Sequence, residues 1–313
     1  MATIVTLTPN PALDLWTTTD RFRTSPKLRC APPQLHPGGG GINVSRVVHR
    51  LGGETLALYA AGGRTGEDLA EAIGSEDVPS DSIRVAGKSR EVFNVCEKAS
   101  GDVMRFVTPG PEASEKEASA LIGLLEQKVA SGSLVVGSGS FPPQMPADFW
   151  GRAASICRKV GGRFLLDSHD GTEAALSEGI YLFRETADAV REIARDNLEW
   201  PGGIGEWAAR RIDLGEAEAV IVTEGAEGAL LVTAGDKCVQ SPPTGIEVKS
   251  AIGAGDSFMG GLCLAIARGK DLREALRYGV AAATATLLTP GTELCRKEDV
   301  ERLLEESPPP RII

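Results

Sequence analysis

The sequence lacks the patterns that mark several common classes of protein. Its six cysteines form no CxxC pair, and its three histidines are dispersed, which argues against zinc sites and a disulfide framework. No apolar run reaches the roughly 18 residues that a membrane span needs. The N-terminal segment also lacks the basic region of a secretion signal. We therefore expect a protein of the reducing cytoplasm that does not associate with a membrane.

Two nucleotide-binding motifs are missing as well. A GxxxxGK[ST] phosphate loop is excluded because Ser82 stands where its first glycine would be needed. The glycines at 38–40 and at 253–255 are not completed to GxGxxG, which leaves a nicotinamide-binding site unsupported. Positive charge is scarce, since 33 Lys and Arg face 43 Asp and Glu for a net charge of −10. No basic stripe is visible, so we expect no binding of nucleic acid.

Strand-like and helix-like segments alternate along the 313 residues, a length that suits one or two domains. This rhythm predicts an α/β fold in which a mostly parallel sheet is sandwiched by helices. Helices are expected at 41–51 and 66–73. Strands are expected at 4–7, 56–60, 134–136, 164–166 and 219–222.

Two segments, 13–35 and 90–107, interrupt this rhythm with alternating, strand-like character. We expect them to be insertions that form a small β lid on a single domain spanning 1–313, and to pair two chains into a homodimer, because exposed strand edges and apolar faces are usually covered. The tail from Ser307 is expected to be an exposed extension. Among the cationic residues of the insertions, four are candidates to bind a phosphate group: Lys27, Arg29, Arg90 and Arg105.

The segment 250–261 carries the strongest chemical signal. Gly253, Ala254 and Gly255 lead into an apolar helix, and backbone N–H groups at a helix start can hold an anion. Asp256 falls in the first turn of that helix. A carboxylate there is ordinarily a cap, and the alternative is a general base that takes the proton of a sugar hydroxyl during phosphoryl transfer.

A second segment, 37–46, contains four successive glycines followed by Asn43. Glycines let the main chain approach a ligand, and an Asn side chain can both donate to and accept from hydroxyls. The alternative is a flexible loop with a helix cap. Asp14 follows the first expected strand, and its carboxylate could accept from two adjacent sugar hydroxyls. On its own, Asp14 is equally compatible with a plain surface residue.

Together these segments resemble the PfkB/ribokinase family, specifically its minor-type 6-phosphofructokinase branch. The resemblance runs through TLTPNPALD, PGGGGINVSR, GAGDSFMGG and PGTELC and covers nearly the whole chain. It implies a ribokinase-like, Rossmann-type core with a β-strand lid. It also implies Mg-ATP as the phosphoryl donor and a phosphorylated ketohexose as the acceptor.

The resemblance implies roles for individual residues, although it leaves the metal ligands unknown. The residues implied to act in catalysis are Gly253, Ala254, Gly255 and Asp256. Those implied to bind the sugar phosphate are Asp14, Lys27, Arg29, Gly39, Gly40, Asn43, Arg90, Arg105 and Ser140. Among these, Arg29 and Arg105 are expected at a partner subunit's site. Those implied to bind the nucleotide are Thr223, Gly225, Gly228, Ala254 and Gly255.

Within the family, 1-phosphofructokinases and tagatose-6-phosphate kinases usually carry GGKG where this chain has four glycines at 38–41. This difference, together with KLRC at 27–30, favours fructose 6-phosphate, with those two activities as alternatives. A third alternative is a non-catalytic sugar-phosphate sensor on the same fold. The intact Asp256 argues against it, since a sensor need not keep the base.

The chain also departs from the family pattern. Thr186 and Ala189 replace an Asn and a Glu associated with magnesium and phosphate, which predicts weaker handling of a second Mg²⁺ ion. Ala251 replaces a usual Thr, and Glu293 stands where a close relative would have Arg. The resemblance implies a monovalent cation such as K⁺, and these two changes leave that expectation open.

Overall fold

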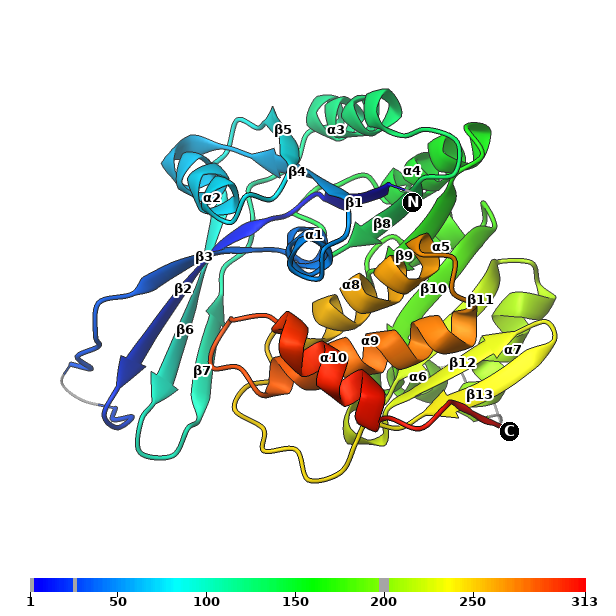
Figure 1. Cartoon of the computed structure of the whole chain (residues 1–313). Coiled ribbons are helices and arrows are strands. Elements are labelled where there is room, and N and C mark those ends of the chain that lie inside the picture. Colours follow the sequence, from blue (N-terminus) through cyan, green and yellow to red (C-terminus); the bar gives the residue numbers. More distant parts are fainter. Residues whose placement is uncertain (1–2, 25–26, 197–202) are drawn as a thin grey trace.

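The computed structural model describes residues 3–24, 27–196 and 203–313 and is built around a ten-stranded sheet (Figure 1). Its strands are ordered β14-β13-β12-β11-β10-β9-β8-β1-β4-β5. The parallel strands are β1 (Ile4–Thr8), β4 (Thr55–Ala61), β5 (Ser80–Arg84), β8 (Leu134–Ser138), β9 (Arg163–Asp167), β10 (Ile180–Thr186) and β11 (Ala217–Thr223). Three antiparallel strands complete one edge: β12 (Ala229–Thr233), β13 (Asp236–Gln240) and β14 (Arg311–Ile312).

Helices cover both faces of this sheet, and adjacent strand residues point to opposite cores. Ile4 packs into one core and Val5 into the other, as the period of two in a strand requires. The first core is covered by α1 (Gly40–Arg50), α8 (Ala254–Ala267), α9 (Leu272–Leu287) and α10 (Lys297–Glu306). The second is covered by α3 (Glu115–Lys128), α4 (Phe149–Lys159), α5 (Thr172–Leu176), α6 (Ala187–Asp196) and α7 (Ile204–Asp213). The helix α2 (Gly63–Ser75) packs beside β4 in a smaller cluster.

The predicted α/β class, with a mostly parallel sheet between helices, is therefore confirmed. The expectation for the C-terminal tail was wrong in one respect. Ser307 is buried and its hydroxyl donates to the carbonyl of Leu303, while Arg311 and Ile312 pair with β13. The end of the chain thus completes the sheet edge, because backbone groups of an edge strand gain partners there.

A second sheet of four strands projects from the main body (Figure 1). Its order is β3-β2-β6-β7, with bounds β3 (Gln34–Gly38), β2 (Ala12–Thr19), β6 (Arg90–Glu97) and β7 (Val103–Val107). These strands come from the two segments that interrupt the α/β rhythm of the sequence. We call this sheet the small sheet.

The register of the small sheet gives its two faces different chemistry. Asp14 on β2 is paired with Val92 on β6, and Val92 with Val107 on β7, so these residues share one face. The next register row crosses all four strands with apolar side chains and lies on the opposite face: Leu35, Leu15, Phe93 and Phe106. In this row, Leu35, Phe93 and Phe106 are exposed.

The helices α1 and α8 approach each other closely because a glycine lies between them. A Cβ built at Gly260 would lie 2.5 Å from Cγ1 of Val47 and 3.2 Å from the carbonyl oxygen of Val44. A larger residue at 260 would push the helices apart, since cores tolerate little extra volume. The same contact places the first turns of the two helices side by side, where the site described next is formed.

Candidate active site

The start of α8 has the geometry of an anion-binding helix N-terminus. Gly253 caps the helix at φ +79°, in the left-handed region that favours glycine, and a Cβ there would lie 2.6 Å from Cδ2 of Leu294. The first helical hydrogen bond runs from Ser257 N to Gly253 O, and Ala254 N donates to Ala251 O at 3.3 Å. The amides of Gly255 and Asp256 precede that first bond, so they can face a ligand.

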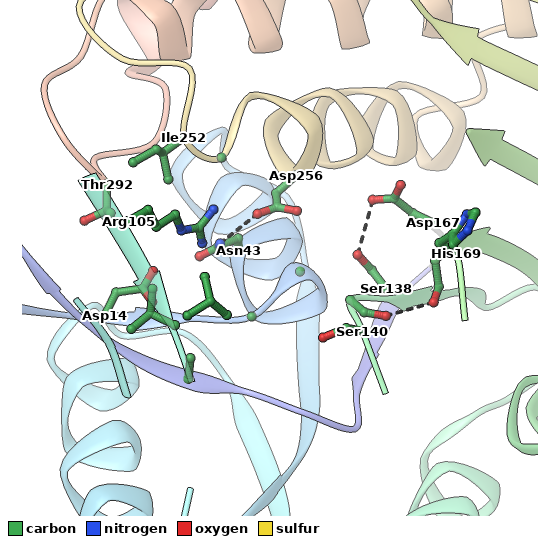
Figure 2. Close-up of a pocket in the computed structure, with 18 of the residues that line it drawn as sticks. Asp14, Asn43, Arg105, Ser138, Ser140, Asp167, His169, Ile252, Asp256 and Thr292 are labelled. Carbon is green, nitrogen blue, oxygen red and sulfur yellow. Dashed lines mark hydrogen bonds between the residues drawn. The ribbon is translucent and has the colours of Figure 1, made fainter. Parts of the chain in front are cut away.

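Asp256 projects from this first turn toward α1 (Figure 2). The side-chain amide of Asn43 donates from Nδ2 to Oδ2 of Asp256 at 2.7 Å. Burial, reinforced by the negative charge of Asp167, raises the pKa of Asp256 to about 7, while Asn43, Arg184 and Arg105 act in the opposite direction. A carboxylate with a pKa near neutrality is well matched to accepting and releasing a proton.

A cavity of about 370 Å³ lies in front of Asp256, between the small sheet and the carboxyl edge of the main sheet. We call it the first cavity. Asp14 lines it and is 5% exposed. Burial raises the pKa of Asp14 to about 6, against the lowering effect of Arg105, Arg46 and Arg90. The first cavity thus combines carboxylates with guanidinium groups, which suits a ligand that carries both hydroxyls and phosphate.

Most of the residues predicted to bind a sugar phosphate line the first cavity: Asp14, Gly39, Gly40, Asn43, Arg90, Arg105 and Ser140. Lys27 and Arg29 do not contribute to its lining. They are exposed in the segment between β2 and β3.

Arg105 lines the cavity of its own chain, and its expected reach to a partner's site stays a prediction. Asn94 is its register partner, and Arg105 lies two residues before Val107, so it shares the face of the small sheet that looks into the cavity of its own chain. Figure 2 shows its side chain beside Asn43.

A second cavity of about 850 Å³ opens on the other side of the α8 N-terminus. It is lined by all five residues predicted on the nucleotide side: Thr223, Gly225, Gly228, Ala254 and Gly255. Its walls also include Ile246, Val248, Phe258, Val280 and Leu287. Apolar walls with a few polar groups are typical of a site for a flat heterocycle, and the glycines leave room for phosphates. The residues present therefore fit ATP.

Arg184 lies at the junction of the two cavities and lines both. Its Nη1 donates to Oδ1 of Asp167 at 2.8 Å, and its Nη2 donates to Oγ1 of Thr223 at 2.6 Å. A Cβ built at Gly255 would be 3.3 Å from both terminal nitrogens, so the guanidinium group lies against the first turn of α8. Its buried Nε has no hydrogen-bond partner among the described residues.

Sequence reasoning missed Arg184 and Asp167 as site residues. Both lie near the carboxyl ends of neighbouring parallel strands, β10 and β9, and this edge is where ligands bind in open α/β sheets. The available signal was a polar residue near the end of each buried strand. Ser138, which ends β8 and donates to Oδ2 of Asp167 at 3.2 Å, follows the same rule.

The altered segment at the end of β10 supplies few ligands for a cation. Thr186 lines the second cavity, and its hydroxyl accepts from the amide of Ala189 at 3.3 Å. Glu185 is buried, and its Oε1 accepts from the amide of Thr186 at 2.8 Å. Within the described ranges, no group of three or more His, Cys, Asp or Glu side chains is arranged to hold a metal ion.

A search of the described helices finds none that is long and apolar enough to cross a membrane.

The chain resembles known proteins along almost all of its length. It is 41% identical over 305 residues to the ATP-dependent 6-phosphofructokinase isozyme 2 of Mycobacterium tuberculosis, covering 96% of this chain and 89% of the relative. It is 36% identical to the isozyme 2 of Escherichia coli, covering 97% and 98%.

The fold also matches that of a solved structure along almost the whole chain. The crystal structure of the Escherichia coli phosphofructokinase-2 in complex with fructose 6-phosphate superposes with a TM-score of 0.90 at 34% identity, over 98% of this chain and 99% of that one. The family model for the pfkB carbohydrate kinases matches residues 10–299. The family model and these relatives agree, and the chain belongs to the pfkB family of carbohydrate kinases.

Proposed function

We propose that the protein transfers the γ-phosphoryl group of ATP to fructose 6-phosphate and so forms fructose 1,6-bisphosphate. The observation that carries this proposal is the position of Asp256, at the helix start that separates the two cavities. The first cavity offers hydroxyl- and phosphate-binding groups, and the second fits a nucleotide. ATP and phosphorylated sugars are held inside cells, which supports the expected cytoplasmic location.

In this proposal Asp256 takes the proton of the acceptor hydroxyl as its oxygen attacks the γ-phosphorus. Oδ2 of Asp256 is engaged by Asn43, which leaves Oδ1 to accept the proton. ADP leaves from the second cavity. The amides of Gly255 and Asp256 and the guanidinium group of Arg184 face the junction where negative charge accumulates, and fixed donors of this kind stabilise the transition state.

ATP enters as its magnesium complex, and the magnesium neutralises charge on the β- and γ-phosphates when bound. Weaker handling of a second Mg²⁺ ion stays a prediction, and the rate against free magnesium at constant MgATP measures it.

The Escherichia coli relative has been solved in complex with potassium. In this chain, the hydroxyl of Ser250 donates to the carbonyl of Gly291 at 2.7 Å, and Ala251 offers no side-chain oxygen. Activation by K⁺ therefore remains a proposal on which no step depends.

The identity of the acceptor is tested by a coupled assay of ADP formation over free and phosphorylated sugars. We expect fructose 6-phosphate to give the highest kcat/KM. Arg90 and Arg105 in the first cavity can bind the phosphate group that the substrate already carries, so free fructose should react poorly. A higher kcat/KM for tagatose 6-phosphate or fructose 1-phosphate would replace the proposed acceptor. No turnover with any sugar would favour a sensor.

The role of Asp256 is tested by Asp256→Asn. The Asn oxygen can still accept from Asn43, so the fold and sugar affinity should persist, but the proton acceptor is lost. We expect kcat to fall by roughly 10²–10⁴-fold. Asp271→Asn is the matched control, because Asp271 caps α9 by accepting from Glu274 N and touches neither cavity. If the folded Asp256→Asn protein retained more than about a tenth of the wild-type kcat, Asp256 would not be the general base.

Arg184→Met tests the guanidinium group at the junction of the cavities. Removing one donor to a developing negative charge should lower kcat by about 10²–10³-fold, with a smaller change in the KM of the sugar phosphate. Arg163→Met is the control, since Arg163 lies over the ring of Tyr181 at the opposite end of the neighbouring strand. Steady-state kinetics at saturating ATP separate the two. Equal losses in both variants would assign Arg184 a role in stability alone.

We further propose that the small sheet acts as a lid on the first cavity and pairs two chains into a homodimer. The exposed apolar row of Leu35, Phe93 and Phe106 gives this sheet a face that a second copy can cover. The exposed position of Lys27 and Arg29 allows them to reach the partner's cavity.

Light scattering at micromolar concentration should therefore report a dimer. Phe106→Lys, at 54% exposure in the apolar row, should shift the protein toward monomer. Gln127→Lys on α3 is the control, because it adds the same positive charge at an exposed position away from this sheet. A fully active protein that is monomeric throughout would contradict the pairing.

A further inference from the structure

Behind the catalytic pair lies a buried arginine that the proposed reaction does not use. Arg46, one turn after Asn43 on α1, is 2% exposed. Its Nε and Nη2 donate to the two carboxylate oxygens of Glu76 at 2.9 and 2.5 Å. Its Nη1 donates to the carbonyl of Pro37 at 2.8 Å and to Oδ1 of Asn43 at 2.9 Å. Arg46 is therefore held on one side by Glu76 and holds Asn43 on the other.

This contact determines which end of the Asn43 amide meets Asp256. A guanidinium group has only donors, so the atom of Asn43 that faces Arg46 must be its oxygen. The NH₂ end then has to point away, and it donates to Oδ2 of Asp256. If the amide were turned around, its oxygen would face the carboxylate and its NH₂ group would face the guanidinium, and both contacts would be lost.

We propose that Arg46 is a positioning residue for phosphoryl transfer, acting through Asn43 to hold Oδ2 of Asp256 and leave Oδ1 free for the acceptor hydroxyl. The proposal rests on the proposed function, because it assigns Asp256 the role of base. The carboxylate of Glu76 completes the device. It pairs with Arg46 and with Arg50, and so fixes the guanidinium group on the side of α1 away from the cavity.

The consequence of losing this device has a definite sign. The charged and polar groups that act on Asp256 are Asp167 from β9, Arg184 from β10, Arg105 from β7 and Asn43 from α1. A hydrogen bond donated to a carboxylate favours its charged form, so the bond from Asn43 lowers the pKa of Asp256. When the amide is no longer oriented, that pKa rises further above its ordinary value. The base works deprotonated, so the acidic limb of the pH–rate profile moves to higher pH.

The test compares Arg46→Lys with Arg50→Met. Lysine keeps the positive charge, but its shorter side chain has one ammonium group, which we expect to stay with Glu76 and release Asn43. Arg50 lies one turn further on α1, shares Glu76 at 3.1 Å and donates to the carbonyl of Leu294, with no contact to Asn43. Arg50→Met therefore removes a charge and an ion pair from the same cluster without releasing the amide.

The readout is the titration of Asp256, followed by ¹³C NMR in ligand-free protein that carries labelled aspartate carboxyls, with Asp256→Asn to assign the signal. We expect Arg46→Lys to move the Asp256 midpoint up by about one pH unit, the worth of one hydrogen bond to a charged group. The acidic limb of kcat/KM should move equally, and kcat should recover at higher pH. Arg50→Met should leave the midpoint unchanged.

An unmoved midpoint in folded Arg46→Lys, with a loss of rate that is uniform in pH, would show a structural role and overturn the proposal. An equal shift in Arg50→Met would overturn it too, by assigning the effect to charge. Should Arg46→Lys not fold, Glu76→Gln decides: it loosens the guanidinium group of Arg46 and should raise the Asp256 midpoint, whereas the loss of a negative charge alone would lower it. The titration needs no substrate, so a protein that phosphorylates no sugar would refute the proposed function alone.

Discussion

The site depends first on the close approach of α1 and α8. Gly260 removes the side chain that would separate them, and Val47 fills the space. The same contact sets the distance between the first turns of both helices, where the 2.7 Å hydrogen bond from Asn43 to Asp256 is formed. Two segments more than two hundred residues apart thus form one part of the candidate site because their helices share a core. An error of an ångström in that packing would break the bond, since hydrogen bonds tolerate little lengthening.

A second constraint is the common direction of the parallel strands. The strands β9, β10 and β11 end at the same edge, which brings Asp167 and Thr223 each within hydrogen-bond distance of Arg184. An acidic protein with a net charge of −10 can therefore bind anionic ligands, because it concentrates guanidinium groups and a helix N-terminus at this edge. Asp167 has two opposed effects there: it fixes Arg184, and its negative charge raises the pKa of Asp256.

The sequence predicts well those features that have a local signal, such as a run of glycines or a regular alternation of segments. The glycine runs identify both helix starts, and the alternation of strands and helices predicts the parallel sheet. Arg184 and Asp167 carry no such signal, because each becomes a site residue only when neighbouring strands align their ends. The sequence could not show that Arg105 lines the cavity of its own chain either, since this depends on the register between β6 and β7. The expectation for the C-terminal tail was wrong for a related reason. Its pairing with β13 is a long-range contact that the proline-rich composition of the tail does not reveal.

The register of the small sheet joins substrate binding to the proposed assembly. Asp14, Val92 and Val107 face the first cavity, while the adjacent row of Leu15, Phe93 and Phe106 faces outward. Because side chains alternate along a strand, a slip of one residue would exchange the two faces. Asp14 would then leave the cavity, and the apolar row would enter it. The burial of Asp14 against Gly38, where a Cβ would lie 2.7 Å from the carboxylate, admits only one of these registers. The contact that holds the Asp14 carboxylate in place therefore also determines which face of the sheet remains for a partner.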